Sequence, residues 1–152
     1  MITAGGENIA PVPIEEAVKA ELGDIVSNVM LVGDNRKHLS IILTMKTELD
    51  SNGQPTTTLH PHVRDWLRPR GCHCDTSSEL SSSDNQQVRE DIMKAIDAAN
   101  SKAQSRAHRV QKYFIAPADF SVETGELTPT LKMKRHFVVK KYEEQISKLY
   151  DC

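Results

Sequence analysis

Two apolar segments separated by a short polar turn constrain the fold of this chain most strongly. Residues 25–34, IVSNVMLVGD, and residues 38–47, HLSIILTMKT, both have the length and the β-branched composition of strands. Only about four turn residues separate them, and a connection of that length favours an antiparallel hairpin. In the second segment Leu39, Ile41 and Leu43 are expected on one face. A sheet with an apolar face must be covered by another layer.

Helical patterns flank this hairpin and can supply the cover. Residues 13–22, PIEEAVKAEL, begin with a proline that suits the first turn of a helix, and they stop before Gly23. A longer helix is expected from near Asn85, where apolar residues recur every three or four positions. They are Val88, Ile92, Ala95, Ile96, Ala99 and Ala103. A last helix is expected at residues 136–150. Its shared apolar face would contain Val139, Tyr142, Ile146 and Leu149.

The remaining segments complete a small α+β layout. Residues 109–117, RVQKYFIAP, are expected to form a third strand, and a short helix is expected at 62–67. Residues 47–60 are expected to form a polar connection, and the serine-rich residues 71–85 a loop or a flexible insertion. The sequence therefore predicts an α+β domain with helices packed on a short, mainly antiparallel sheet.

Composition and charge exclude several classes of function. The 152 residues suit one domain, and 19 basic and 21 acidic side chains give a net charge of −2. A domain that binds nucleic acid over its whole surface is usually strongly basic. No apolar run approaches the roughly 20 residues of a membrane-spanning helix. Three cysteines, Cys72, Cys74 and Cys152, are too sparse for a disulfide framework, and the N-terminus has no signal-peptide pattern. We therefore expect a cytoplasmic protein.

The first motif with chemical potential is TAGGENIAPVP, at residues 3–13. It places Gly5 and Gly6 before Glu7 and Asn8. Adjacent glycines let the backbone adopt positive φ or approach a ligand closely. By itself, however, such a pair is more typical of an ordinary loop at the entrance of a helix.

The second motif is GELTPTLKMKR, at residues 125–135. Pro129 favours extended backbone in the residue before it, and Lys132 follows three positions later. The basic residues of this segment and of the helix after it are Lys132, Lys134, Arg135, Lys140 and Lys141. The pattern alone leaves three interpretations open: a solvated helix face, a lysine that handles phosphate, and a basic patch that binds nucleic acid.

Together, and in this order, the two motifs resemble the C-terminal domain of the adenylate-forming acyl-CoA synthetases. The resemblance extends through SNVMLVGD, HLSIILTMK and DFSVETGELTPTLKMKR, and it is strongest to the bubblegum branch of long- and very-long-chain acyl-CoA synthetases. It covers residues 1–152 and fades at 47–85, which we expect to be a variable insertion. Many relatives have a glycine directly before the lysine, where this chain has Leu131; the long-chain form of the motif tolerates this.

The resemblance implies a long-chain fatty acid–CoA ligase that works in two steps. A fatty acid and ATP give an acyl-adenylate and pyrophosphate, and CoA then gives acyl-CoA and AMP. A large N-terminal adenylation domain, which we expect upstream of Met1, would bind ATP, Mg²⁺ and the fatty acid. The C-terminal domain would rotate as a lid between the steps, and alone it is expected to be inactive.

The resemblance also assigns roles to residues. Lys132 takes the position of the adenylation lysine, where an ammonium offsets the repulsion between carboxylate and α-phosphate. Lys134 and Arg135 are expected to position this loop or to start the next helix. The loop that would face the CoA channel and the other domain consists of Gly5, Gly6, Glu7 and Asn8.

Two alternatives are weighed against this assignment. A non-catalytic module could dock anionic lipid or nucleic acid through the basic segment 132–141, although we expect no nucleic-acid partner. Zinc could be suggested by His60, His62 and the CHC run at 72–74, but their spacings differ from C-x₂₋₄-C and H-x₃₋₅-H, so we expect no metal site. For the full-length enzyme, peripheral association with the endoplasmic reticulum membrane stays open.

Overall fold

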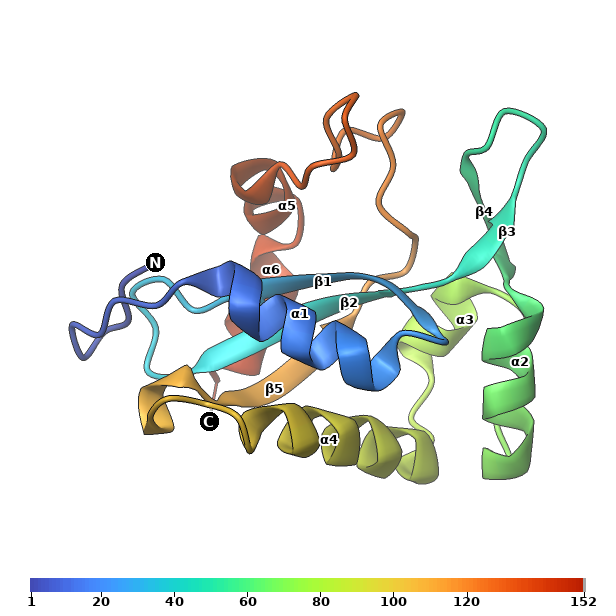
Figure 1. The fold of residues 1–152 in the computed structure, drawn as a ribbon. Coiled ribbons are helices and arrows are strands. Elements are labelled where there is room, and N and C mark those ends of the chain that lie inside the picture. The colour runs from blue at the N-terminus through green and yellow to red at the C-terminus, as the bar shows by residue number, and fades with distance from the viewer. Residues whose placement is uncertain (152) are drawn as a thin grey trace.

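The predicted hairpin lies at the centre of the computed structural model, which describes residues 1–151 (Figure 1). Strand β1, Val26–Val32, pairs antiparallel with β2, Leu39–Met45, so the hairpin is confirmed. The third predicted strand, β5 at Val110–Ile115, pairs with β2 in parallel. The sheet order is β1-β2-β5, and the sheet is mixed.

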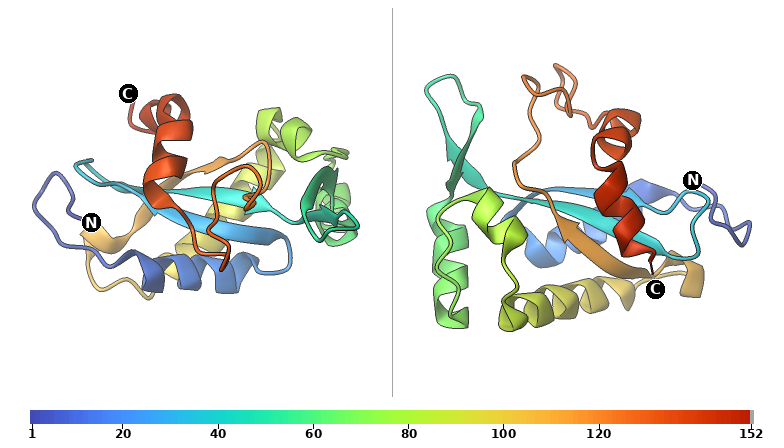
Figure 2. Two further views of the ribbon diagram at one scale, coloured as in Figure 1. Left: turned by 90° about the horizontal axis from the view of Figure 1, so that it is seen from above. Right: turned by 180° about the vertical axis from the view of Figure 1, so that it is seen from behind.

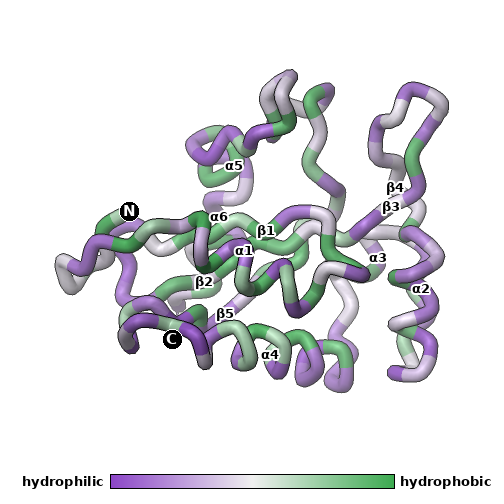
Figure 3. Tube along the Cα trace, in the orientation of Figure 1, coloured by the Kyte–Doolittle hydropathy of each residue, from purple (hydrophilic) through white to green (hydrophobic). Residues whose placement is uncertain are grey.

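Helices α1 and α4 cover one face of this sheet. Helix α1 spans Pro11–Leu22 and ends at Gly23, and α4 spans Gln86–Asn100 after Asn85, whose side chain accepts a hydrogen bond from a backbone N–H of the first turn. The side chains of β2 that belong to this core are those predicted to share a face: Leu39, Ile41 and Leu43. Figure 3 shows hydrophobic residues concentrated along the central strands. Ala103 lies beyond the end of α4, contrary to the predicted pattern.

Two short helices cover the opposite face, where one helix was predicted at 136–150. Helix α5 spans Arg135–Lys141 and α6 spans Glu143–Leu149 (Figure 2). Tyr142 lies at the break with φ −108° and ψ 24°, outside helical geometry. Its buried ring lies 5.7 Å from that of Phe114 on β5, so packing against the sheet accompanies the break.

The buried face of these two helices differs from the predicted one by one residue. Val138, Tyr142 and Ile146 are buried and repeat every four positions. Val139 was predicted to share this face, but 42% of its surface is exposed, and Leu149 is only partly buried. Neighbouring residues of a helix point about 100° apart, so predicting Val139 instead of Val138 on the buried face rotated that face away from the sheet.

Residues 47–60 form a second hairpin instead of the predicted polar connection. Strand β3, Thr47–Leu49, pairs antiparallel with β4, Pro55–Leu59. The turn contains an Asn-Gly dipeptide in which Gly53 has φ +77°, and the carboxylate of Asp50 accepts two backbone N–H bonds there. Asn-Gly between two strands is a recognised hairpin signal, so the sequence contained the information.

Residues 71–85 contain a helix where a loop or flexible insertion was predicted. Helix α3 spans Ser77–Ser82, and Leu80 is buried in the core. The hydroxyl of Thr76 accepts from the backbone N–H of Glu79 at 3.2 Å and donates to its carboxylate at 2.9 Å. An N-cap threonine whose hydroxyl accepts from a backbone N–H of the first turn stabilises that turn, and this favours a helix in the serine-rich segment.

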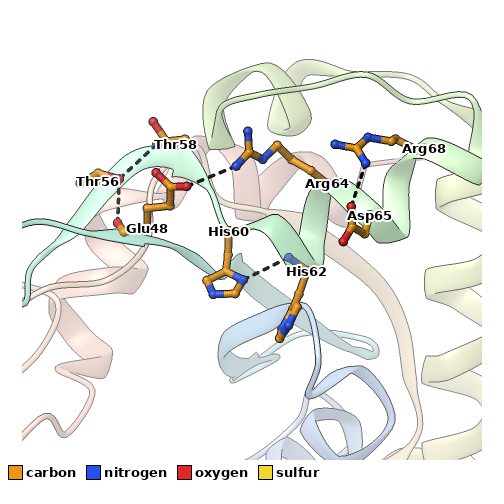
Figure 4. A network of polar contacts seen from close by, with 8 residues as sticks. All are labelled: Glu48, Thr56, Thr58, His60, His62, Arg64, Asp65 and Arg68. Atoms are coloured by element: carbon orange, nitrogen blue, oxygen red, sulfur yellow. Dashed lines mark hydrogen bonds and ion pairs between the residues drawn. The ribbon is translucent and has the colours of Figure 1, made fainter.

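Helix α2, Pro61–Leu67, confirms the predicted short helix and packs beside the β3–β4 hairpin (Figure 4). Arg64 and Glu48 form an ion pair at 3.2 Å, and the His60 ring accepts from the backbone N–H of His62 at 3.1 Å. Two 3-10 turns complete the elements, η1 at Arg68–Arg70 and η2 at Arg106–His108. No helix within residues 1–151 is both long enough and apolar enough to cross a membrane.

Candidate functional site

Lys132 lies in a tight turn between β5 and α5. The backbone N–H of Thr128 donates to the carbonyl of Lys132, and the N–H of Leu131 donates to the carbonyl of Thr128, both at 2.8 Å. The N–H of Lys132 donates to the hydroxyl of Thr128 at 3.1 Å, and Leu127 pairs with Met133 just below. These bonds fix the backbone of the turn. The side chain of Lys132 is exposed and forms no salt bridge within the described residues.

Leu131 occupies the position in this turn that favours glycine. Its φ is +65°, in the left-handed region where Cβ crowds the carbonyl oxygen at a cost of about 1–2 kcal/mol. The side chain is 68% exposed, so burial compensates little of this cost. The turn therefore accommodates a leucine at a position that favours glycine, but with backbone strain.

The glycine loop has the same hydrogen-bonding pattern. The N–H of Thr3 donates to the carbonyl of Glu7, and the N–H of Gly6 donates to the carbonyl of Thr3, both at 3.0 Å. The N–H of Glu7 donates to the hydroxyl of Thr3 at 3.2 Å. Gly6 has φ +82° and corresponds to Leu131 of the lysine turn. A Cβ on Gly6 would meet no atom within 4 Å, so this face of the loop is open.

The glycine loop rests on the turn between β1 and β2. The N–H of Ala4 donates to the carbonyl of Arg36 at 2.9 Å. Gly5, Gly6, Glu7 and Asn8 are all exposed, and Asn8 pairs through its backbone with Ile2. The backbone is thus anchored from one side, while the four residues predicted to meet the CoA channel are accessible.

Arg135 and Glu15 join the segment that carries Lys132 to helix α1. The two guanidinium nitrogens Nη1 and Nη2 of Arg135 donate to Oε2 and Oε1 of Glu15 at 2.6 and 2.7 Å. The Glu15 side chain is only 8% exposed, and its Oε2 also accepts from the N–H of Leu31 on β1 at 2.7 Å. The hydrogen bonds that Arg135 donates to Glu15 raise the pKa of Arg135. Sequence patterns gave no sign of this pair, whose members are 120 positions apart.

A second buried carboxylate, Glu126, anchors the other side of this segment. It accepts from the Lys141 ammonium at 2.6 Å, from the Ser121 N–H at 3.0 Å and from the Thr124 hydroxyl. Burial alone would raise the pKa of Glu126, but these hydrogen bonds outweigh burial and hold the pKa below its usual value. The carbonyl of Glu126 also accepts from the N–H of Lys134 at 2.7 Å. The lysine turn therefore projects from a base fixed on both sides.

The five basic residues of 132–141 do not form one uniform patch. Arg135 and Lys141 are bound to buried carboxylates. Lys132, Lys134 and Lys140 are exposed and form no salt bridge within residues 1–151. A surface that docks polyanions needs several free cations together. The pairing of Arg135 and Lys141 therefore disfavours the docking module as a function for this segment.

The histidines and cysteines considered for zinc contact one another in pairs. No group of three or more His, Cys, Asp or Glu in the part of the chain that the structure describes is placed to hold a metal ion. His60 caps helix α2, with its ring 4.6 Å from that of His62. The sulfurs of Cys72 and Cys74 are 3.5 Å apart, and burial together with the neighbouring thiol raises the pKa of Cys74 to about 11.

The mixed sheet between two helical layers matches the fold of one part of adenylation domains of known structure. The adenylation domain of the carboxylate reductase from Mycobacterium chelonae superposes with a TM-score of 0.69 at 16% identity, over 99% of this chain and 19% of that one. The adenylation–carrier didomain of a carboxylic acid reductase from Segniliparus rugosus superposes with a TM-score of 0.67 at 18% identity. The match covers 99% of this chain and 17% of that one. At such identities these neighbours show the fold alone.

The chain belongs to the AMP-binding enzyme C-terminal domain family, whose model matches residues 1–66 and 71–152. It is 41% identical over 151 residues to the human long-chain-fatty-acid–CoA ligase ACSBG2. The aligned residues are 99% of this chain and 22% of the relative. It is 43% identical to the mouse long-chain-fatty-acid–CoA ligase ACSBG1, and the aligned residues are 99% of this chain and 21% of that relative. The chain thus spans about a fifth of the length of the curated relatives that it matches.

Proposed function

We propose that this chain is the C-terminal lid of a long-chain fatty acid–CoA ligase and is catalytic when joined to a large N-terminal adenylation domain. That ligase converts a fatty acid and ATP to acyl-adenylate and pyrophosphate, and then uses CoA to form acyl-CoA and AMP. The observation that carries this proposal is the exposed Lys132, held on a fixed turn in a chain that belongs to the AMP-binding C-terminal family. The likeness to two named long-chain ligases supports the substrate class.

Lys132 acts in the first step. When the fatty acid carboxylate attacks the α-phosphate, two anionic groups approach each other. The Lys132 ammonium, brought into the large domain's cleft, loses water and stabilises the charge that shifts to the phosphate oxygens in the transition state. An exposed side chain on a rigid backbone turn suits this role, since little packing must break before the lysine enters the cleft.

The glycine loop acts in the second step. After the lid rotates, residues 5–8 face the CoA thiol and its pantetheine arm. The open face at Gly6 lets backbone approach that arm closely. ATP and Mg²⁺ belong to the large domain in this proposal. No cluster of side chains within residues 1–151 fits a metal ion, so the Mg²⁺ ligands would come from the large domain.

We also propose that the full-length enzyme works in the cytoplasm and associates peripherally with the endoplasmic reticulum membrane. Free thiols at Cys72 and Cys74 support a reducing compartment, and a long-chain acyl product supports a site near a bilayer. Cell fractionation tests both parts. Recovery of all the enzyme in the soluble fraction would refute the membrane association.

The central test compares Lys132→Ala with Lys134→Ala in the full-length enzyme, with the two half-reactions assayed separately. Lys132→Ala should slow adenylate formation by roughly 10²–10³, as when one preorganised donor is removed from a transition state. The thioester step, started from supplied acyl-adenylate, should be nearly normal. Lys134→Ala should cost far less. Equal losses, with inhibition by salt, would mean that the cluster acts as diffuse positive charge and would refute a single catalytic lysine.

A further inference from the structure

One partly buried contact connects the two segments that carry the proposed chemistry. Arg135 follows Lys132 by three residues, and Glu15 lies on α1, the helix that directly follows the glycine loop. Their fork-to-carboxylate contact also reaches β1 through Leu31. The lysine turn, helix α1 and the central sheet therefore meet at a single carboxylate.

The geometry of this contact restricts orientation as well as distance. Two parallel hydrogen bonds between a planar guanidinium and a carboxylate fix both position and angle, which a single ammonium contact does not. Glu15 is nearly inaccessible at 8%, while Arg135 remains 34% exposed. The carboxylate is thus held by the core, and the arginine takes its orientation from the carboxylate.

The base of the lysine turn has a second anchor at Glu126, on the other side. The carbonyl of Glu126 binds the N–H of Lys134, and Leu127 pairs with Met133. With this anchor alone, the turn could still pivot about it. Beside the turn lies an open groove of about 590 Å³ that is lined by Lys132, Glu15 and Arg135 among others, so the lysine side chain has room to point in several directions.

We propose that Arg135 and Glu15 form a positioning clamp that sets the orientation of the Lys132 turn for adenylate formation. This inference rests on the proposed role of Lys132. Neither Arg135 nor Glu15 would touch the substrate, so the clamp can act only through the lysine. A displacement of about 1 Å in a catalytic group can cost about 10²-fold in rate, so a clamp three residues away is close enough to matter. After the lid rotates, Lys132 leaves the reacting atoms, and the clamp has no comparable role in the thioester step.

The test is the double variant Glu15→Gln/Arg135→Gln in the full-length enzyme. It removes the ionic fork and leaves no buried charge unpaired, and the amide oxygen of the new side chain can still accept from Leu31. We expect adenylate formation to fall by about 10- to 100-fold and the thioester step, from supplied acyl-adenylate, to change little. Should the double variant not fold, Arg135→Lys takes its place, because it keeps the charge and loses the fork.

A matched control removes another partly buried arginine–carboxylate pair of the same domain. Arg70 and Asp91 join η1 to α4 at 2.7 Å, with side chains 24% and 19% exposed. Arg70→Gln/Asp91→Asn should lower the unfolding temperature comparably but affect the two half-reactions equally. A selective loss of adenylation in the control would overturn the proposal, because general destabilisation would then explain the effect.

Adding Lys132→Ala separates the clamp from the proposed function. If the clamp acts through the lysine, the triple variant should form adenylate no more slowly than Lys132→Ala alone. If the clamp substitutions slow adenylate formation as much in the Lys132→Ala background as in the parent enzyme, the clamp proposal fails while the lysine keeps its role. If Lys132→Ala alone leaves adenylation intact, the proposed function fails, and the clamp fails with it.

Discussion

Replacing Lys141 by methionine should destabilise this chain by about 2 kcal/mol at pH 7. The change removes one donor from the buried Glu126 carboxylate, which is 1% exposed, and leaves the Ser121 N–H and the Thr124 hydroxyl. Removing one partner of a fully buried ion pair costs about 3–5 kcal/mol. Lys141 is 39% exposed, so solvent screens part of the attraction, and about half of that figure is expected.

The cost should depend on pH in a defined direction. Hydrogen bonds hold the pKa of Glu126 below its usual value despite burial. A lowered folded-state pKa contributes stability that is present above the unfolded carboxyl pKa and is lost as pH falls through the folded value. The difference in unfolding free energy between the parent chain and Lys141→Met should therefore be full at pH 7 and shrink below about pH 4.

Urea and thermal unfolding followed by circular dichroism measure this difference. A loss of about 2 kcal/mol corresponds to about 4–8 °C in Tm for a chain of this size. Lys140→Met is the matched control, since Lys140 is exposed and should change stability by less than about 0.5 kcal/mol. The ion-pair account is wrong if both variants lose equal stability, or if the cost of Lys141→Met is the same at pH 3 as at pH 7.

Three further predictions concern the turns and the isolated chain. Gly6→Trp in the full-length enzyme should block the thioester step and spare adenylation. Gly5→Ala, whose new methyl group would lie 3.9 Å from the nearest atom, should leave both steps unchanged. Equal loss of both half-reactions in Gly6→Trp would mean that the loop is only structural. Leu131→Gly should be near neutral in equilibrium unfolding, because relief of about 1–2 kcal/mol of strain is offset by the entropy of glycine, about 0.5–1 kcal/mol. Leu131→Val should cost more, since β-branched residues strongly avoid positive φ, and a smaller cost would contradict the left-handed assignment. The purified 152-residue chain should release no pyrophosphate with fatty acid and ATP, and clear turnover would overturn the lid assignment.

The spacing of apolar residues was sufficient to predict the helices and strands that have a strongly apolar face or pair with a neighbour in sequence. The β1–β2 hairpin, α1, α4 and β5 were predicted from their spacing and flanking residues. The β3–β4 hairpin and α3 were missed although Asn-Gly at residues 52–53 and Thr-x-x-Glu at residues 76–79 indicated them. Polar, serine-rich composition outweighed those short signals, because a hairpin or helix with few apolar residues looks like a loop in a hydrophobicity pattern.

Other features depend on contacts between distant residues and leave no local trace. The parallel partner of β2, the break at Tyr142 and the Arg135–Glu15 fork each require tertiary packing that spacing does not encode. The candidate site was located through motif order, which placed Lys132 and the glycine loop without showing what holds them. Their catalytic roles stay predictions until the half-reactions are measured.

The parallel pairing of β2 with β5 also bears on how such a domain tolerates insertions and deletions. The chain leaves the sheet after Met45 and returns at Val110 to the neighbouring strand. Closing a loop costs free energy that grows only logarithmically with its length, about 0.6 kcal/mol for each doubling. Both turns proposed for chemistry, residues 3–7 and 128–132, lie outside this excursion. Residues can therefore be gained or lost in the exposed turns between these strands, such as residues 50–53, while the lysine turn and the glycine loop keep their positions.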